Sequence, residues 1–368
     1  MRAHVRVVLC LAALALCLAV AACGSDSDSG GASTTTGGKV DGGGESFVYN
    51  AAGASAPFQE ALNASYLKAF DEQFNFKTTV DPFCCGIERL QAAQSSGNVP
   101  WSAVQWVTSA DYELAKRAGL LEPLDTSVVP VDLLEPGTYD RYGYQVYTSG
   151  VQLAWLPDTY PAGEEPTTFT DLFDTDRFPG KRCLYQGSQF GGNFEGALLS
   201  AGVPSDELYP LDLDLAFRQL DKIKPDIVWW RSGAEAAQFL LDGTCKLGVI
   251  WNGVAQSTTN AGNPISVTWD QAITVYGMNT IPKGSPNPEA AQELLGLMLS
   301  DRDAQVEFIS RTAYTSPLKD PATLPPDVAK WAPQGENLAT TIAEDSIYYA
   351  ENNAEITKAF NDWLVAGR

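Results

Sequence analysis

Short apolar runs alternate with helix-forming stretches in two separate blocks of this sequence. In the first block the expected strands are 47–50, 76–80 and 103–107, and the expected helices follow Ser55 and cover 87–94 and 110–118. Phe58, Leu62, Tyr66 and Phe70 recur every four residues and would form the buried face of the first helix. Strands that alternate with helices in this way predict a parallel sheet covered by helices on both faces.

The second block repeats the alternation. Its expected elements are strands 183–185, 227–230 and 247–251 and helices 194–201, 213–223 and 234–241. Two extended stretches, 142–155 and 272–282, lie on either side of this block and would cross between the halves as a hinge. We therefore expect an α/β fold of two lobes, each a mostly parallel sheet flanked by helices. Lobe 1 would comprise 47–146 and 273–368, with C-terminal helices that contact both lobes, and lobe 2 would comprise 147–272.

The first 22 residues have the layout of an export signal. Arg2 and Arg6 precede an apolar stretch that ends in small residues, and Val20-Ala21-Ala22-Cys23 is similar to the lipobox of bacterial lipoproteins. Residues 23–46, rich in glycine and serine, would be a spacer after a lipid-modified Cys23. An uncleaved membrane helix is the alternative, but its far end lacks basic or aromatic residues. We expect an extracytoplasmic protein, lipid-anchored to the outer face of the cell membrane or periplasmic.

Composition excludes several classes of function. The chain has a formal net charge of −21, so nucleic acid is not an expected partner. An acidic surface aids solubility and is also compatible with a cationic ligand. The only histidine is His4, inside the expected signal, which removes histidine-dependent triads and most transition-metal sites from the body. We expect no cofactor, no metal and no enzymatic activity.

Four cysteines follow the lipobox: Cys84, Cys85, Cys183 and Cys245. An even number of cysteines in an exported protein predicts disulfides. Cys183 and Cys245 stand at the starts of two strands that could lie side by side, and we expect a bond between them. The remaining pair would be adjacent in sequence, a strained geometry of the kind found in functional loops. Free or differently paired thiols are the alternative.

Five short motifs carry a family resemblance. They are FPGKR at 178–182, IVWWRSG at 227–233, LGVIWNG at 247–253, IPKGSPN at 281–287 and AYTSP at 313–317. Together they make the chain resemble class II extracellular solute-binding proteins of ABC transporters, most of all the spermidine/putrescine-binding branch. The resemblance implies a periplasmic-binding-protein-like fold that closes on a small solute. It also implies a monomer that delivers a polyamine, or a related amine or amino-acid-like compound, to an ABC permease and its ATPase.

Ligands of α/β sheets bind beyond the carboxyl ends of the strands, and sites between lobes bury most of a small ligand. The expected ligand-binding residues lie in those loops and in the hinge: Ser55, Cys84, Cys85, Ser109, Tyr147, Gln189, Trp230, Arg231, Glu235, Trp251 and Asn252. Trp230, Trp251 and Tyr147 could form a box around an amine. The family's WNG motif assigns Trp251 and Asn252 to the site. Burial in the core is the alternative for the tryptophans.

The sequence departs from polyamine binders at two loops. The first-strand loop, Ala54-Ser55-Ala56, lacks the aromatic residues that such relatives use. Such relatives hold ammonium groups with carboxylates, including a pair just before the helix that here begins near Phe194. This chain has no acid between Gln189 and Glu195, which disfavours a long polycation. Glu235 could bind one ammonium and Arg231 one carboxylate, as a zwitterion such as an ω-amino acid would need. A solvated pair at a helix start is the alternative.

Three other functions remain as alternatives. Ferric-ion transport is one, because related proteins hold iron with adjacent tyrosines and Tyr348-Tyr349 is such a pair, although neighbours on a helix point about 100° apart. A secreted carboxylate-dependent hydrolase is the second, and it would need two acids facing each other in a cleft. A surface adhesion lipoprotein is the third, and it would bind no small solute.

Overall fold

One hydrogen-bonded sheet runs through both blocks of the sequence. The computed structural model describes residues 40–83 and 86–366. Their ten-stranded sheet has the order β2-β1-β3-β9-β5-β8-β6-β7, with β4 and β10 pairing onto β9. The strands are β1 (Ser46–Ala51), β2 (Lys77–Asp81), β3 (Ala103–Trp106), β4 (Leu121–Glu122), β5 (Gly143–Trp155), β6 (Arg182–Tyr185), β7 (Ile227–Trp230), β8 (Leu247–Trp251), β9 (Ser266–Pro282) and β10 (Ile342–Ala343). Pairing is parallel within each block, between β1 and both β2 and β3, and between β6 and both β7 and β8.

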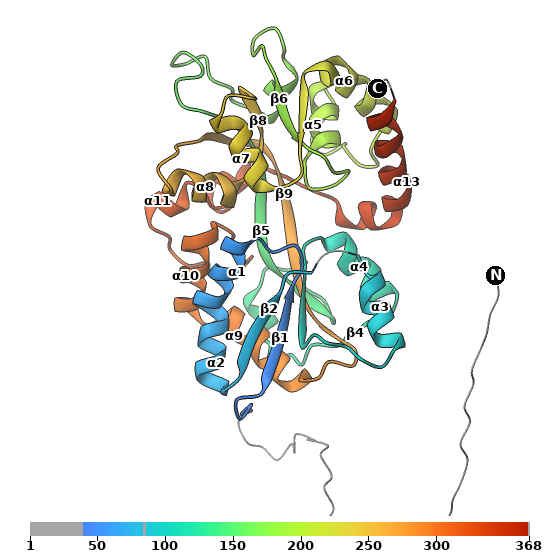
Figure 1. Cartoon of the computed structure of the whole chain (residues 1–368), viewed down its shortest axis with the longest axis vertical. Helices are drawn as coiled ribbons and strands as arrows, with labels where there is room; N and C mark the ends of the chain where they lie inside the picture. Colours follow the sequence, from blue (N-terminus) through green and yellow to red (C-terminus); the bar gives the residue numbers. More distant parts are fainter. Residues whose placement is uncertain (1–39, 84–85, 367–368) are drawn as a thin grey trace, which may run out of the picture. The chain divides into compact units, whose positions relative to one another are not determined.

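The two long strands β5 and β9 join the halves. They pair antiparallel from Gly143 opposite Thr280 to Trp155 opposite Ser266, and both run through the two groups of elements (Figure 1). The extended stretches predicted from the sequence are therefore confirmed. Strand β9 begins earlier than predicted, because residues from Ser266 onward pair with the end of β5.

Among the described residues, helices cover the sheet around three hydrophobic cores, two in the first lobe and one in the second. The helices are α1 (Ala56–Leu62), α2 (Lys68–Phe74), α3 (Glu88–Ser95), α4 (Ser109–Arg117), α5 (Asn193–Ser200), α6 (Leu213–Ile223), α7 (Gly233–Leu241), α8 (Asn252–Asn260), α9 (Pro288–Ser300), α10 (Arg302–Thr312), α11 (Pro326–Ala329), α12 (Glu336–Ala339) and α13 (Ser346–Val365). A π-turn, η1 (Asn63–Leu67), and three 3-10 helices, η2 (Val131–Leu133), η3 (Phe169–Phe173) and η4 (Lys224–Asp226), complete the set. This mixed α/β architecture agrees with the fold class predicted from the sequence.

The first helical stretch contains an irregular turn with a clear cause. Residues spaced by four drift about 40° per step around an α-helix, since successive residues are about 100° apart. The wider turn η1 lies between α1 and α2 and absorbs this drift. As a result Leu62, Tyr66 and Phe70 are all buried on one face, while Phe58 is half-buried.

The C-terminal helix belongs to the core of the second lobe. Tyr349, Ile356 and Phe360 of α13 lie in the same hydrophobic cluster as the second-lobe strands. Helix α13 also meets α4 of the first lobe, where Arg117 and Glu351 form an ion pair of 3.0 Å. The boundaries predicted from the sequence assign 273–368 to the first lobe with contacts to both. The apolar pattern of α13 shows that it packs on a core, but it does not show on which one.

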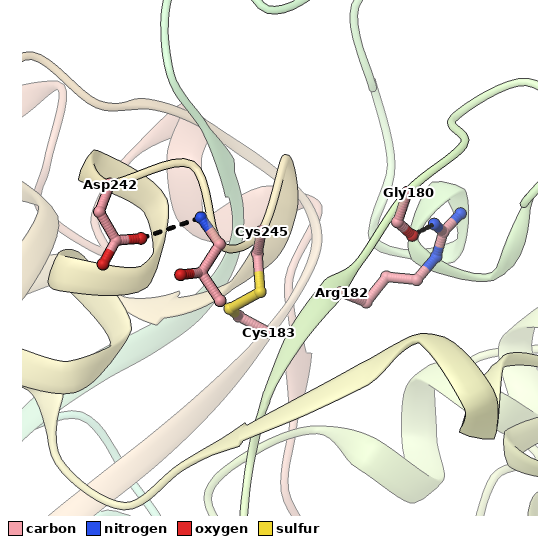
Figure 2. Close-up of a disulfide and its surroundings, with 6 residues drawn as sticks. Gly180, Arg182, Cys183, Asp242 and Cys245 are labelled. Carbon is pink, nitrogen blue, oxygen red and sulfur yellow. Dashed lines mark hydrogen bonds between the residues drawn. A yellow bond between two sulfur atoms is a disulfide. The ribbon is translucent and has the colours of Figure 1, made fainter.

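A disulfide and a buried arginine fix the start of β6. Cys183 and Cys245 are bonded, with their Cα atoms 5.8 Å apart (Figure 2). This is the pairing predicted from the sequence, and it is possible because β6 and β8 are neighbours. The Arg182 guanidinium is fully buried and donates only to backbone carbonyls, those of Leu172, Asp174, Phe178 and Gly180. The expected signal, most of the spacer with Cys23, and Cys84 and Cys85 lie outside the described residues.

Replacing Cys183 and Cys245 together by alanine should lower the free energy of unfolding by about 2–5 kcal/mol. The bond joins residues 62 positions apart and so restricts the unfolded chain over a long loop. Urea unfolding of the variant and of the wild type measures the difference, and peptide mapping without reductant should recover the two cysteine peptides joined. Equal urea midpoints for the two proteins would contradict the prediction.

Candidate functional site

The loops after the parallel strands hold most of the residues expected to bind a ligand. Ser109 begins α4 after β3, and its hydroxyl donates to the Tyr276 carbonyl of β9 over 3.2 Å. Gln189 lies in the loop after β6 and donates to Asn353 of α13 over 2.8 Å. Trp251 ends β8. The loop after β3 therefore lies against the hinge strand β9, and the loop after β6 lies against α13.

Three aromatic side chains at the ends of β6, β7 and β8 form an aromatic corner, which we define as Tyr185, Trp230 and Trp251. The ring centroids of Tyr185 and Trp230 are 4.8 Å apart, and those of Trp230 and Trp251 are 5.0 Å apart and nearly perpendicular. Trp230 is fully buried, whereas Trp251 is half-buried. Trp251 and Tyr185 therefore both remain partly exposed, and the buried Trp230 packs against each of them.

The loop 186–193 is held tightly between the aromatic corner and the hinge. Phe190 has a φ of 63°, a left-handed conformation that is rare for a bulky residue. Its carbonyl accepts a hydrogen bond from Nε1 of Trp251 over 3.2 Å, and its N–H donates to Oε2 of Glu344 over 3.1 Å. A Cβ on Gly192 would lie 2.7 Å from Ile273 of β9, so only glycine fits there. Backbone strain supported by its surroundings is typical of ligand-binding loops.

Two buried carboxyl groups stand beside this loop. Glu344 follows β10 directly, and its N–H donates to the Thr274 carbonyl of β9 over 3.0 Å. Glu195 lies in the first turn of α5, and one oxygen of its carboxyl accepts hydrogen bonds from the hydroxyls of Tyr209 and Tyr349 over 2.7 and 2.8 Å. Glu195 is 1% exposed and Glu344 is 8% exposed.

Burial raises the pKa of both carboxyls, because the charged form loses its water. The negative charge of Glu195 adds to this effect and raises the pKa of Glu344 to about 8, while the N–H of Phe190 opposes it. Two carboxylates that share a buried site do not both ionise readily. Burial and the charge of Glu195 therefore both favour the protonated form of Glu344.

Glu344 is the residue that sequence reasoning missed. The loop 186–193 lacks an acid of its own, but Glu344, 154 positions after Phe190, supplies one. The link depends on the parallel pairing of β10 with β9, which joins Ile342 to Ile273 and Ala343 to Thr274. A two-residue strand leaves no recognisable pattern in the sequence. The one available signal was an acid next to an apolar pair within the C-terminal region.

The sequence left open whether Arg231 and Glu235 bind a ligand or form a solvated pair at the start of a helix. Ser232 and Glu235 make a capping box at the start of α7, in which Oε2 of Glu235 accepts the N–H of Ser232 over 3.2 Å. The same oxygen also accepts the N–H of Arg231 over 2.6 Å. The Arg231 side chain is exposed, and its Nε donates to Gln186 over 2.5 Å. Glu235 is thus occupied by backbone groups, whereas the guanidinium of Arg231 keeps donors that point to no described partner.

Three residues that were expected to bind a ligand are either buried within the protein or make no capping hydrogen bond through their side chain. The side chain of Asn252 is fully buried and donates to the carbonyls of Ala313 and Trp331, and it accepts the N–H of Gly150 from β5. Tyr147 is buried in the first-lobe core. Its ring centroid lies 5.2 Å from that of Tyr314. Ser55 is exposed at the start of α1 and makes no capping hydrogen bond through its side chain.

The adjacent tyrosines considered for iron point to different places. The Tyr349 hydroxyl is committed to Glu195, whereas the ring of Tyr348 packs on Tyr209 at 5.4 Å. Within residues 40–83 and 86–366, no group of three or more His, Cys, Asp or Glu side chains is placed to hold a metal ion. Among the same residues, no helix combines the length and apolar character needed to span a membrane.

A groove of about 610 Å³ lies between α4 of the first lobe and α13 of the second. This is the size range of small-molecule sites. Its lining consists of Leu114 on α4 and, on α13, Ala350, Glu351, Asn353, Ala354, Thr357, Lys358, Asn361 and Asp362. Asn353 is also the partner of Gln189. The groove thus borders the loop 186–193, which carries the strained Phe190.

Comparisons with known proteins agree on one family. The model of a family described as bacterial extracellular solute-binding protein matches residues 65–334, which is most of the chain. The gamma-aminobutyric acid-binding protein of Pseudomonas aeruginosa is 27% identical over 325 residues, covering 86% of this chain and 90% of that protein. The spermidine/putrescine-binding periplasmic protein of Escherichia coli is 30% identical over 139 residues, covering 37% and 39%.

Solved structures give the same result. The structure of the Atu4243 GABA receptor matches with a TM-score of 0.78 and 30% sequence identity. The match covers 88% of this chain and 98% of that chain. These matched proteins are named for the solutes that they bind, and none is named as an enzyme.

The buried acid pair predicts an unusual pH dependence of stability. In the folded protein the pair retains a proton up to about pH 8, whereas the unfolded chain releases it near the ordinary value of 4.5. The pair should therefore lower stability progressively as the pH rises from about 4.5 to about 8, by at most about 1.4 kcal/mol per pH unit. The chain's only histidine is His4, so no histidine of the folded body obscures this window.

Urea unfolding at pH 5.5, 6.5, 7.5 and 8.5 measures the slope. Glu344→Gln should flatten it, because glutamine keeps the shape and does not titrate. Glu355→Gln, at an exposed position on α13, should keep the wild-type slope and serves as the matched control. A wild-type stability that rises from pH 5.5 to 8 would show that the pair is ionised in the folded protein.

Proposed function

Because the chain belongs to the family of bacterial extracellular solute-binding proteins, we propose that it captures a small amine or amino-acid-like solute and hands it to an ABC permease with its ATPase. The observation that carries this proposal is that the aromatic corner and Glu344 both contact the loop 186–193. An indole face attracts an ammonium group by about 0.5–2 kcal/mol, and a carboxyl group beside it provides the opposite charge. The backbone of Phe190 links them, because its N–H donates to Glu344 and its carbonyl accepts a hydrogen bond from Trp251.

We propose a zwitterion in preference to a long polycation. The relative named for γ-aminobutyric acid matches 86% of this chain, while the spermidine/putrescine-binding relative from Escherichia coli matches 37%. Arg231 follows β7, and its exposed guanidinium would receive the carboxylate of the solute through its planar fork. An ammonium near Trp251 and a carboxylate at Arg231 would together fit an ω-amino acid.

Closure of the lobes would complete the site. Strands β5 and β9 are the hinge of the proposal, and α4 of the first lobe already contacts α13 of the second through the Arg117–Glu351 ion pair. A closed site excludes water, and opposite charges then attract more strongly because the local dielectric constant falls. This motion is the usual response of two-lobed binding proteins to a ligand.

A panel of solutes tests the proposal. γ-Aminobutyrate, putrescine, spermidine and butyrate are added to the protein, and stabilisation is followed by thermal unfolding and then by calorimetry. We expect γ-aminobutyrate to bind and to be recovered unchanged. Trp251→Ala should weaken its binding at least tenfold without unfolding the protein, because the exposed part of the aromatic corner is lost.

Trp229→Ala is the matched control for this variant. Trp229 is on the neighbouring strand β7 but packs on Phe360 and Trp363 of α13, with centroid distances of 5.8 and 6.1 Å. Its replacement should reduce stability and leave the dissociation constant within about twofold. Equal affinity of Trp251→Ala and wild type would remove Trp251 from the site. Consumption of a solute would instead favour an enzyme.

We further propose that the protein is held at the membrane through a lipid on Cys23, with the segment that follows as its spacer, and acts as a monomer. Support comes from the signal-like residues 1–22 and the glycine-rich stretch after them. One acyl chain anchors only weakly, so the cysteine would carry more than one.

Cys23→Ala tests the anchor in cells. Loss of the acylated cysteine should move the protein from the membrane fraction to the soluble extracytoplasmic fraction, as measured by fractionation and immunoblotting. The wild type should carry a mass increment on its mature N-terminus. An uncleaved membrane helix predicts the opposite, namely that Cys23→Ala stays in the membrane with residues 1–22 still attached.

A further inference from the structure

The two lobes meet on both sides of the hinge, and the two contacts differ in their packing. Helix α8 of the second lobe meets α10 of the first on one side of β5 and β9, and α4 meets α13 on the other (Figure 1). In the first contact, Nε2 of the buried Gln256 donates to the Ser310 carbonyl over 3.2 Å. A Cβ on Gly253 would lie 2.5 Å from the Thr312 carbonyl, so the two backbones approach closely there. The α8–α10 side could not open without breaking buried contacts.

The α4–α13 contact is held partly by exposed groups. Ala110, Leu114 and Arg117 of α4 are spaced by four and three residues, so they share one face of the helix. Ala110 is buried against the second-lobe core and Leu114 is half-buried. Arg117 forms its 3.0 Å ion pair with Glu351, and the two side chains are 45% and 54% exposed. In the part of the chain that the structure describes, no other ion pair joins the lobes.

The groove between α4 and α13 shows that this contact is incompletely packed. Its volume of about 610 Å³ lies between Leu114 and α13. Separation on this side would therefore break an exposed ion pair and a small apolar contact. The groove also borders the loop 186–193, because Asn353 of its lining accepts a hydrogen bond from Gln189 of that loop over 2.8 Å. Opening between α4 and α13 would uncover the loop that holds the indole of Trp251.

We infer that the Arg117–Glu351 ion pair is a clasp that holds the lobes closed, that the lobes part between α4 and α13, and that the α8–α10 side is the pivot. This inference rests on the proposed function and deepens it, because it names residues that control affinity and the side by which a solute enters. Arg117 and Glu351 are positioning residues. They act on the population of the closed form and need not touch the solute.

Charge reversal measures the strength of the clasp. An exposed ion pair changes an equilibrium by less than about fivefold, and a pair of like charges opposes it to a similar extent. Arg117→Glu should therefore raise the dissociation constants of γ-aminobutyrate and putrescine about three- to tenfold, mainly through faster dissociation. Calorimetry measures the affinity, and stopped-flow tryptophan fluorescence measures the rates. Arg117→Glu combined with Glu351→Arg should return both to within about twofold of the wild type.

Arg311→Glu is the matched control. Arg311, like Arg117, stands in the last turn of a helix; it is 43% exposed and pairs with Glu307 at 2.6 Å. Both partners belong to α10, so this pair does not join the lobes. Its reversal should destabilise the helix end as Arg117→Glu does, but it should leave affinity and rates within about twofold of the wild type. Equal losses of affinity in the two reversals, or no recovery in the double reversal, would contradict the clasp.

A cross-link tests the direction of opening. Arg117→Cys combined with Glu351→Cys is joined by a short bismaleimide, and the same reagent is applied to the wild type and to Arg311→Cys combined with Glu307→Cys. The cross-linked clasp should prevent entry, so the association of either probe that is seen in the two treated controls should be lost. Association at the control rate would show that the solute does not enter between α4 and α13, and the inference would be wrong.

Small-angle X-ray scattering tests the clasp without any solute. The empty Arg117→Glu protein should have a larger radius of gyration than the empty cross-linked protein, because only the former opens. Equal radii would overturn the inference and leave the proposed function in place. If neither probe binds the wild type, the proposed amine function is wrong, and the scattering comparison still decides whether the lobes part at the clasp.

Discussion

The antiparallel pairing of β5 with β9 is the constraint on which the rest of the structure depends. These strands carry hydrogen bonds through both lobes, so two α/β blocks become one sheet. Gly150 and Gly277 leave room there for aromatic rings, because a Cβ on either glycine would lie 2.5 Å from Trp269 or Tyr147, respectively. Asn252 ties Gly150 to Ala313 and Trp331 and so fixes the start of α8 to the hinge. Every loop of the candidate site is positioned relative to this strand pair.

Local patterns in the sequence were sufficient for most elements of the fold. Strands β7 and β8 and helix α6 have the predicted limits, because each apolar run is bounded by turn or capping residues. The cysteine pairing was also predictable, since two strand starts in one parallel sheet bring their side chains together. Packing between segments far apart in the sequence was not predictable in the same way. The chain crosses between the lobes a third time at the two-residue strand β10. This crossing determines on which core α13 packs.

The candidate site shows the same division between local and distant information. Trp230 and Trp251 were identified from their positions at strand ends, and Trp251 also from the resemblance to the family's WNG motif. The third residue of the expected box, Tyr147, lies in the first-lobe core, and Tyr185, which takes its place beside Trp230, was not predicted. The spacing from Ser232 to Glu235 is likewise typical of a capping box at the start of α7. Glu344 was not predicted, since its place beside Phe190 follows from contacts between segments 154 positions apart. The absence of an acid in the loop 186–193 was a correct observation, but it did not establish the charge around that loop.

The distribution of buried charge argues for the class of solute. At the strand ends of the first lobe, Asp81 accepts the indole N–H of Trp101 over 2.7 Å, and Asp111 lies against the N–H of Gly86 at 3.4 Å. Both acids thus have partners within their own lobe. A polyamine needs a carboxylate for each of several ammonium groups, whereas the second lobe offers one acid pair on one side and the exposed Arg231 at the end of β7. On the proposed function, the separation between Glu344 and Arg231 in the closed protein sets the length of the solute.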